Sequence, residues 1–492
     1  MLSLKELLAV RREPYDKKRA AFISKAYYFA EKAHRGQKRM TGEPYFIHSV
    51  ETAKTLIQMG LGSNSVAAAL LHDVPEDTDT TLEEVKKEFG KEVAFIVEGV
   101  TKVGKIRLRG ATDEVYLENL RKMFLAMAAD IRVVLIKIAD RLDNMQTLHV
   151  HSRAKQISIA KETMEVFVPI ANRLGVGEIK NKMEDLAFKY LEPKAYAKTV
   201  KLSEEALSAR AKYTKRAISE LQKELKQEKI EILNIVGRAK HYYRFHQKLL
   251  KHNMKVDEVY DLAAIRIIVP TVEDCYRVLG IVHKRYNPMI GRIKDYISLP
   301  KPNGYKSLHT TIFGPEGKIL EVQIRTRKMN YEAEYGIAAH WIYSGDRTFK
   351  DLLFRRKKDE LEKQLDWVKQ LQSWHEETGG LSDEFWASLK IDFFKNHIFA
   401  FTPRGDVIDL PEGATPVDFA YSIHTDLGDT LSGAKINQKI ASLDYSIRNG
   451  DVVELITEKN KKAPNEDWLK FVKTTLAKSK IKAALKKNKL NF

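Results

Sequence analysis

The sequence predicts a multidomain protein in which an all-α domain precedes a mixed α/β domain and a small β-grasp module. Three observations support this prediction. Apolar residues recur at spacings of three and four up to about residue 195, and β-branched runs then alternate with helical patterns. Short apolar runs separated by Gly and Pro turns follow near residue 395. A chain of 492 residues is long enough for about three domains that each bury a core.

The helical pattern is clearest in three apolar runs, Val66–Leu71, Val93–Val97 and Met123–Met127, and we assign residues 1–195 to the first domain. The second domain, residues 196–346, begins with a polar linker helix at about 200–228. Its expected strands are Ile230–Val236, Leu262–Val269, Leu308–Phe313 and Lys318–Ile324, and its expected helices are Val272–Tyr286 and Met329–Tyr343.

The last third of the chain changes character twice. Residues 347–394 are charged and helical in pattern, so we expect a connector there. The β-grasp module spans residues 395–460, and a basic tail spans residues 461–492. The expected strands of the module are Ile398–Thr402, Val407–Leu410 and Val452–Ile456.

Composition limits the class of protein. A content of 43% hydrophobic and 30% charged residues is typical of a soluble globular protein, and no apolar run approaches the roughly 20 residues of a membrane span. The charged N-terminus lacks the apolar core of a signal peptide. The single cysteine, Cys275, can form neither an internal disulfide nor a cysteine-built zinc site, so we expect a buried structural thiol. These features predict a cytoplasmic protein without a membrane partner.

The formal net charge of +18 indicates polyanionic partners, namely nucleotides, RNA or both. Two lysine-rich stretches have ordinary explanations. Residues 203–228 form a helix of alternating charge that is typical of a solvated face. Residues 470–489 form a helical tail that could either contact RNA or keep the chain soluble.

Two histidines and two aspartates in the helical half could hold a metal ion. His72 and Asp73 end an apolar helix just before a proline, His48 lies upstream, and Asp140 follows an apolar run in which an unpaired acid is costly to bury. A divalent ion held by two imidazoles and two carboxylates would lower the pKa of water and supply hydroxide near neutral pH. Glu76 and Asp77, one turn after the pair, could move protons. The alternative is that each histidine is merely hydrogen-bonded at a helix end.

A basic loop, GRIKDYISLPKPNGYKSLHTT (291–311), has the composition of a phosphate-binding site. Two prolines and an Asn-Gly pair force loop geometry. The loop places cations beside Asn303, Tyr305 and His309, and polyphosphate with a nucleobase is the ligand that needs such a mixture. A merely basic loop is the alternative.

A carboxylate follows on a neighbouring strand. In LEVQIRT (320–326), alternation sends the apolar residues to one sheet face and Glu321, Gln323 and Arg325 to the other. Asp261, before the expected second strand, offers another carboxylate, and two acids near polyphosphate suit magnesium-assisted phosphoryl transfer. The run GRAKH (237–241) follows a strand and adds cations, but the sequence has no GxxxxGK[ST] P-loop.

The first half resembles the hydrolase domain, of HD type, of the RelA/SpoT-type bifunctional enzymes of guanosine tetra- and pentaphosphate metabolism. The matching motifs are RMTGEPYFIH (39–48), AALLHDVPEDT (68–78), EGVTKV (98–103), ENLRKM (118–123) and KIADRLDNMQTL (137–148). The resemblance implies that a manganese ion is bound by His48, His72, Asp73 and Asp140. It also implies that Glu76 and Asp77 assist the water and that Arg39 and Asn144 contact the nucleotide. Met40 stands where many relatives have a second basic residue, and this difference is expected to alter the grip on phosphate. Ser49 stands where many relatives have a proline.

The second half resembles the synthetase domain of the same family, through GRAKHYYRFHQK (237–248), YDLAAIRIIV (260–269), the loop 291–311, EVQIRT (321–326) and AEYGIAAHW (333–341). The resemblance implies transfer of pyrophosphate from ATP to the 3′-hydroxyl of GDP or GTP. Asp261 and Glu321 would hold magnesium, and Glu321 would be the base. Tyr305 would stack on guanine, and the remaining nucleotide-binding residues would be Arg238, Lys240, Arg266, Lys294, Lys301, Asn303, His309 and Gln323. Arg292 to Asp295 match the RxKD form of the bifunctional members.

Residues 399–437 resemble the TGS domain, which in ribosome-bound relatives meets the tRNA acceptor end. His424 matches the histidine implicated in that contact, so deacylated tRNA and the ribosome are candidate partners, while an exposed structural histidine is the alternative. The C-terminal ACT region of long relatives is not expected in this sequence.

The expected function is therefore bifunctional (p)ppGpp synthesis and hydrolysis, with Mn²⁺ in the hydrolase and Mg²⁺ in the synthetase, in control of the stringent response. Two alternatives are a one-way enzyme with the other site silenced and a ribosome- or tRNA-binding regulator. The sequence gives no oligomeric state and no preference between GDP and GTP.

Overall fold

The computed structural model describes residues 2–11, 14–104, 130–239, 241–256, 259, 263–301, 303–339, 397–448, 450–458 and 463–489. The chain divides into two compact units, Met1–Ser373 and Trp374–Phe492. Lys240, Asp261, the motif at 118–123 and the predicted connector at 347–394 lie outside the described residues. None of the described helices combines the length and apolar content needed to cross a membrane.

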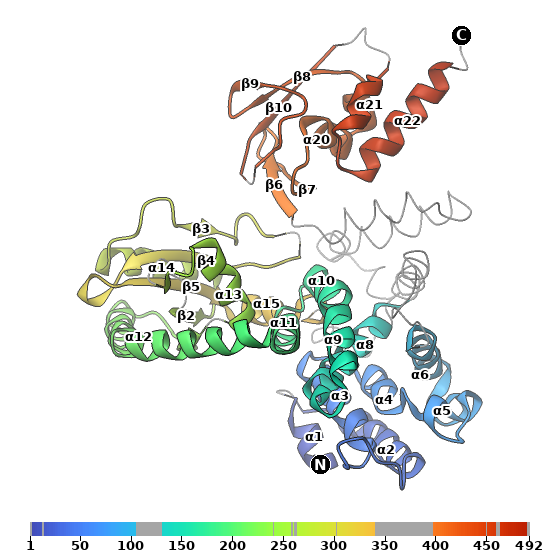
Figure 1. Ribbon diagram of the computed structural model, residues 1–492. Coiled ribbons are helices and arrows are strands. Elements are labelled where there is room, and N and C mark those ends of the chain that lie inside the picture. Colours follow the sequence, from blue (N-terminus) through green and yellow to red (C-terminus); the bar gives the residue numbers. More distant parts are fainter. Residues whose placement is uncertain are drawn as a thin grey trace. The chain divides into compact units, whose positions relative to one another are not determined.

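The first part of the first unit is helical, as predicted, over its described residues (Figure 1). In chain order its elements are α1 Leu4–Ala9, α2 Lys17–Ala33, α3 Phe46–Gln58, α4 Ser63–Leu71, α5 Val74–Asp77, α6 Leu82–Gly104, α8 Ile131–Gln146, η1 Leu148–Val150, α9 Arg153–Glu162, η2 Thr163–Phe167, α10 Val168–Arg173 and α11 Gly177–Leu191.

Helix α4 is the centre of this helical half. Every residue of α4 except Asn64 is buried, and the helix packs against α2, α3 and α6, because a helix that is apolar nearly all round must be covered on all sides. Helix α8 begins where the Asp130 side chain accepts a hydrogen bond from the Arg132 amide, and it packs against α3. These contacts bring the N-terminal end of α3, the C-terminal end of α4 and the middle of α8 together around one buried point.

The α/β part of the first unit is built on a five-stranded mixed sheet in the order β1-β2-β5-β4-β3. Strands β2 and β5 are parallel and the other neighbours are antiparallel. The elements are α12 Pro193–Gln227, β1 Asn234–Ala239, α13 Tyr242–Lys251, β2 Ala263–Val269, α14 Val272–Arg285, β3 Lys294–Asp295, β4 Leu308–Phe313, η4 Pro315–Gly317, β5 Ile319–Thr326, α15 Arg327–Tyr335 and η5 Gly336–Ala338.

One face of this sheet forms the main hydrophobic core of the α/β part. Leu320, Val322 and Ile324 are fully buried on that face, as the alternation predicted, and α12 and α14 cover it (Figure 1). Cys275 of α14 belongs to the same core, and burial raises the pKa of its thiol to about 12, which agrees with a structural role.

Four sequence-based assignments need correction. The first strand begins at Asn234 rather than Ile230, because a turn at Lys229, with φ of 54°, follows α12. Gly237 and Arg238 therefore lie within β1 and do not follow it. The polar linker helix is part of α12, whose Ala217, Leu221 and Leu225 are buried in the sheet core. Helix α15 ends at Tyr335, because Gly336 adopts a φ of 53°.

The second unit contains two small sheets and helices, with the strand order β10-β8-β9 in one sheet and the pair β6-β7 in the other. Its elements are β6 His397–Phe401, β7 Val407–Pro411, α20 Pro416–Ile423, α21 Thr425–Asp429, β8 Leu431–Ile436, β9 Lys439–Ala441, β10 Val453–Thr457, η6 Glu466–Lys470 and α22 Thr475–Lys489. The predicted basic tail contributes to this unit, because Trp468, Ala477 and Ile481 pack in one cluster with Val417 and Tyr421 of α20.

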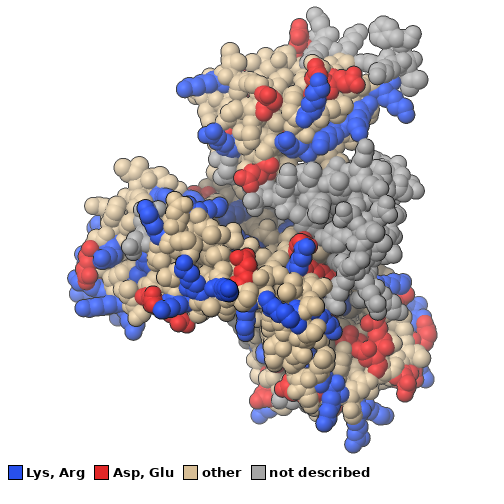
Figure 2. All heavy atoms as spheres, in the orientation of Figure 1, with Lys and Arg blue, Asp and Glu red and all other residues tan. Residues whose placement is uncertain are grey.

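Lysine and arginine side chains are spread over the visible face of the α/β part, with acidic side chains between them (Figure 2). The net charge of +18 is thus not gathered into a single patch on that face. Local clusters of residues, rather than the total charge, therefore indicate where ligands would bind.

Candidate active sites

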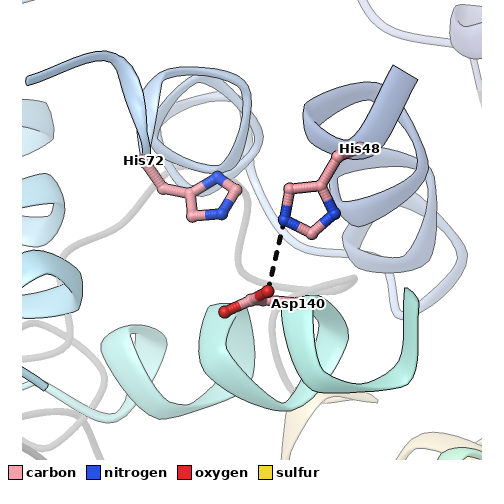
Figure 3. Close-up of side chains that lie close together, drawn as sticks. All are labelled: His48, His72 and Asp140. Atoms are coloured by element: carbon pink, nitrogen blue, oxygen red, sulfur yellow. Dashed lines mark ion pairs between the residues drawn. The ribbon is translucent and has the colours of Figure 1, made fainter. Parts of the chain in front are cut away.

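The predicted metal-binding residues come together from three helices in the helical half. His48 lies on α3, His72 caps the C-terminal end of α4, and Asp140 lies on α8 (Figure 3). One ligand atom from each of these three buried residues lies within 4.8 Å of the others. Such spacing is compatible with one divalent ion.

Asp73 lies at the same cluster. Its Oδ2 is 3.2 Å from His72 Nε2 and 3.5 Å from His48 Nε2, while Asp140 Oδ1 is 3.2 Å from His48 Nε2. All four predicted ligands therefore converge, and each imidazole presents its Nε2 to the carboxylates.

Hydrogen bonds on the far side of each ring select this orientation. His72 Nδ1 donates to the carbonyl oxygen of Ala69 at 2.8 Å, and His48 Nδ1 contacts Asp143 Oδ2 at 2.6 Å. A neutral imidazole that donates through Nδ1 has its lone pair on Nε2, which is the form that binds metal. His72 Nε2 is buried and makes no hydrogen bond within the described part of the chain, so this donor set fits a metal ion.

The electrostatics of the cluster favour a positive charge at its centre. Burial lowers the pKa of His72, in keeping with a neutral ligand. Burial also opposes charge on His48, but hydrogen bonds to Asp140 and Asp143 raise the pKa of His48 to about 10. Burial opposes ionisation of Asp140 too, yet Lys137 and His48 hold its pKa well below the usual range. The site thus stabilises either a proton on His48 or a cation in its place.

Polar groups surround the cluster on the side of α5. Tyr45 donates to Asp77 Oδ2 at 2.8 Å, and its Oη lies 3.1 Å from Asp73 Oδ2. Burial is the main cause that raises the pKa of Tyr45, so its hydroxyl stays protonated. Glu76 and Asp77 are exposed on α5. Sequence analysis missed Tyr45, for which the sequence offers no local pattern.

The predicted nucleotide contacts Arg39 and Asn144 also lie at this cluster. Arg39 donates to Asp143 Oδ2 at 2.8 Å and to Asn144 Oδ1 at 3.1 Å, and Asn144 donates to Asp140 Oδ1 at 2.5 Å. Sequence analysis also missed Asp143. Its position three residues after Asp140 and before Asn144 places all three on one side of α8, and that spacing is the signal that could have identified it.

A second polar cluster lies on the other face of the five-stranded sheet. His309 Nδ1 contacts Glu321 Oε1 at 2.8 Å, and the other ring nitrogen contacts Tyr305 Oη at 2.7 Å. Arg325 donates to Tyr305 Oη at 3.1 Å and to Gln323 Oε1 at 3.0 Å. One network therefore joins Glu321, Tyr305 and Gln323, which are the predicted base, the predicted stacking residue and the predicted support for the acceptor. Buried Arg325 adds a cation to this network.

The predicted cations that the structure describes come from the loop and from three strands. Lys301 Nζ lies 4.7 Å from the ring centre of Tyr296 and 5.2 Å from that of Tyr305. Lys294 is exposed on β3 and pairs in register with His309 of β4. Arg238 and Arg266 lie on the neighbouring strands β1 and β2.

A cavity of about 190 Å³ lies where the helical half meets the α/β part. Its cations are Lys180 from α11 and four residues of the α/β part, and its full lining is Asn172, Gly175, Gly177, Glu178, Lys180, Asn181, Arg238, Arg266, Lys301, Asn303, Tyr305, Arg325, Glu332, Ala333 and Glu334. Burial, followed by nearby Arg325 and Arg238, lowers the pKa of Arg266 to about 10. A pocket with this excess of buried positive charge favours an anionic ligand.

The helical half contributes to that cavity through direct contacts. Asn303 Nδ2 donates to the carbonyl oxygen of Asn172 at 3.4 Å, and Arg244 binds Glu184 through two hydrogen bonds of 2.8 and 2.9 Å. Burial lowers the pKa of Lys180 to about 8, and Arg244 and Lys301 add to this effect. Sequence analysis assigned no role to Lys180, because nothing local to α11 marks it.

His424 of the second unit is exposed, with 65% of its side chain accessible. Its Nδ1 accepts a hydrogen bond from the Asp426 amide at 3.2 Å, so His424 caps the short helix α21. Exposure leaves this imidazole open to a partner, and the cap gives it a structural role as well.

Comparison with known families matches three consecutive parts of the chain. Residues 26–177 match the HD domain, residues 237–348 match the region found in RelA / SpoT proteins, and residues 398–457 match the TGS domain. The metal cluster lies within the first match and the Glu321 cluster within the second.

Three relatives align along nearly the whole chain. The guanosine-3′,5′-bis(diphosphate) 3′-pyrophosphohydrolase of Aquifex aeolicus is 46% identical over 466 residues, which cover 94% of this chain and 64% of the relative. The GTP pyrophosphokinase of Streptomyces coelicolor is 44% identical, with coverage of 95% and 56%. The bifunctional (p)ppGpp synthase/hydrolase RelA of Mycobacterium tuberculosis is 42% identical, with coverage of 97% and 64%.

The chain thus spans less than two thirds of the length of each of these relatives. Within that span the order of the three domains and the identity along the chain agree with the resemblance in the motifs. The chain belongs to the RelA/SpoT family and carries its HD, RelA/SpoT and TGS domains in that order.

Proposed function

We propose that this protein both hydrolyses and synthesises (p)ppGpp. The helical half would release pyrophosphate from (p)ppGpp and leave GDP or GTP, and the α/β part would transfer pyrophosphate from ATP to the 3′-hydroxyl of GDP or GTP. One observation carries the proposal: a single chain assembles a buried His/Asp cluster and, separately, a carboxylate beside a basic, aromatic pocket. The names of the relatives give both activities.

In the hydrolase, His48, His72, Asp73 and Asp140 would hold Mn²⁺. When bound, the ion would lower the pKa of a water molecule and so supply a nucleophile. Glu76 and Asp77 would accept a proton from that water, and Tyr45 would orient Asp77 through its 2.8 Å hydrogen bond. Arg39 would contact the phosphates at the edge of the cluster.

In the synthetase, Glu321 would accept the proton of the 3′-hydroxyl as that oxygen attacks the β-phosphorus of ATP and AMP leaves. His309 orients the Glu321 carboxylate through Oε1. Tyr305 would stack on guanine, Gln323 would support the acceptor, and Lys294, Lys301 and His309 would contact phosphates. Arg238 and Arg266 would sandwich adenine, and Lys240 would meet phosphate.

Magnesium at this site would be held by Glu321 together with Asp261, and would neutralise charge on the transferred phosphates. The control of the stringent response would follow from having both reactions in one chain. Because ATP, GDP and GTP are cytoplasmic metabolites, the reactions would take place in the cytoplasm.

Product analysis with each metal separately tests the proposal. ATP, GDP and Mg²⁺ should yield ppGpp and AMP, and ppGpp with Mn²⁺ should yield GDP and pyrophosphate. Absence of both products with folded protein would refute the function. Product in only one direction under every effector tried would support the one-way alternative.

A role in tRNA or ribosome binding is a second candidate, supported by the TGS match and by the exposure of His424. Binding of labelled deacylated tRNA should weaken on His424→Ala. Substitution of Asp426 by Ala removes the neighbouring acid without removing the ring, and it serves as the matched control.

A further inference from the structure

The two imidazoles of the metal cluster are held in different ways. His72 donates through Nδ1 to a main-chain carbonyl, that of Ala69, whereas His48 relies on a side chain, that of Asp143. Only the second of these two hydrogen-bond acceptors can be removed by substitution, because the first belongs to the main chain. Asp143 lies on α8 one turn after Asp140 and is only 6% exposed.

A single oxygen of Asp143 serves two partners. Asp143 Oδ2 lies 2.6 Å from His48 Nδ1 and 2.8 Å from Arg39 Nη1. Arg39 is itself largely buried, with 12% of its side chain accessible, so its charge needs the Asp143 carboxylate.

These contacts form a closed ring of five residues. Arg39 continues through Asn144 to Asp140, and Asp140 Oδ1 returns to His48 Nε2 at 3.2 Å. Every member of the ring therefore contacts two neighbours, and Asp143 is the member that joins His48 directly to Arg39. Substituting Asp143 would remove one of the two ring contacts of His48 and one of the two ring contacts of Arg39.

We propose that Asp143 is a positioning residue of the metal centre, which holds His48 in the tautomer with its lone pair on Nε2 and couples Arg39 to the cluster. A carboxylate that accepts the outer N–H of a ligating histidine fixes the ring and raises its basicity as a ligand. The inference rests on the proposed metal centre and assigns no contact between Asp143 and the ion.

Metal titration of the full chain tests this role. Mn²⁺ binding without nucleotide is measured by calorimetry for wild type, Asp143→Ala and Asp143→Asn. Loss of an outer carboxylate of this kind weakens metal binding on the order of 10- to 100-fold, which we expect for Asp143→Ala. Asp143→Asn should lose less Mn²⁺ affinity, because its amide oxygen can still accept a hydrogen bond from His48 Nδ1. Glu83→Gln, an exposed carboxylate on α6, is the matched control and should bind Mn²⁺ as wild type does.

A second measurement separates positioning from a merely structural role. Imidazole ¹H–¹⁵N spectra of the metal-free protein should show a His48 Nδ1 proton that exchanges slowly with water, because Asp143 accepts it. Asp143→Ala should lose this slowly exchanging signal, while His72 keeps its own Nδ1 signal because Ala69 still accepts that proton. Asp143→Asn, which preserves side-chain volume, gives the same comparison if the alanine variant does not fold.

The outcomes are distinguishable. Unchanged Mn²⁺ affinity and an unchanged His48 Nδ1 proton signal in Asp143→Ala would overturn this inference and leave the proposed function standing. Failure of the wild-type chain to bind Mn²⁺ would overturn the metal centre, and this inference with it. Weaker binding with loss of the His48 Nδ1 proton signal would establish Asp143 as the positioning residue.

Discussion

His309 contacts Glu321 through Nδ1 at 2.8 Å, and this pair determines how protons are arranged in the second cluster. With Nδ1 donating to the carboxylate, Nε2 accepts the hydroxyl proton of Tyr305. Burial lowers the pKa of His309, and Arg325 and Lys301 lower it further, although Glu321 opposes them. A neutral His309 therefore suits all of its partners, and the network is complete before substrate binds.

Replacing Glu321 should separate the two activities. Glu321→Ala removes the proposed base, and general base catalysis contributes about 10²- to 10⁴-fold to a rate. We expect synthesis of ppGpp from ATP and GDP to fall by that factor while hydrolysis of ppGpp is retained. Radiolabelled product analysis measures both rates on one preparation. Equal loss of both activities would contradict separate sites.

Replacing Asp73 should have the opposite effect. Asp73→Ala removes an oxygen that lies 3.2 Å from His72 Nε2 and 3.5 Å from His48 Nε2. Hydrolysis should become undetectable, and synthesis should continue. Mn²⁺ at 100 times its dissociation constant should stabilise the wild-type fold by about 2.7 kcal/mol, and this gain should shrink in the variant. Thermal unfolding with and without Mn²⁺ measures the difference.

Tyr305→Phe should change the titration of His309 while keeping the aromatic ring. The hydroxyl donates to Nε2 at 2.7 Å and so stabilises neutral imidazole. Without that donor, the pKa of His309 should rise toward the ordinary value of 6.5. NMR titration of the His309 ring protons measures the shift. An unaltered pKa would show that burial and the neighbouring charges set the pKa of His309 without the hydroxyl of Tyr305.

The depressed pKa of His309 also has a consequence for stability. Below pH 6.5 the unfolded chain binds a proton at this position more readily than the folded chain, so the free energy of unfolding decreases as pH falls through this window. Above pH 6.5 the contribution is constant. Urea unfolding at pH 7.5 and 5.5 should show a smaller difference for Tyr305→Phe than for wild type. An equal difference would assign the pH dependence to other groups.

Gly336→Ala should weaken the junction between the two halves of the first unit. A Cβ at this position would lie 2.1 Å from the carbonyl oxygen of Leu174, and the φ of 53° already disfavours a side chain. Gly317 has a similar φ of 67° with no atom within 4 Å of an added Cβ, so Gly317→Ala measures the conformational cost alone. Urea unfolding should show a clearly larger loss for Gly336→Ala. Equal losses would mean that the close approach is relieved easily.

Sequence patterns predicted the elements whose burial alternates cleanly. Strand β4, Leu308–Phe313, has the predicted bounds because its inward residues alternate with polar ones. The pattern failed at Ile230 and Ile232, which pack on the sheet core from outside any strand. Apolar character reports burial, and a turn such as that at Lys229 decides which part of a buried run forms a strand.

The residues of the candidate sites also differ in whether the sequence could predict them. Residue types and motifs were enough to group His48, His72, Asp73 and Asp140, since two imidazoles and two carboxylates are a donor set that suits a divalent ion. Roles for Asp143 and Lys180 were not predicted, because these roles depend on the residues that lie opposite them in space. The spacing of Asp140, Asp143 and Asn144 places Asp143 on the same side of α8 as the ligand, but Asp143 meets His48 across 95 positions of sequence, and that spacing does not identify the partner.

Helix α12 connects the helical half of the first unit to its α/β part. Its 35 residues begin two positions after α11 ends, and its apolar side chains are packed into the sheet core. A helix of that length is about 52 Å long, so a tilt of about 5° at Pro193 would displace Gln227 by about 4–5 Å. A small tilt of α12 beside α11 would therefore move the sheet core that packs on the C-terminal half of the helix by a much larger distance.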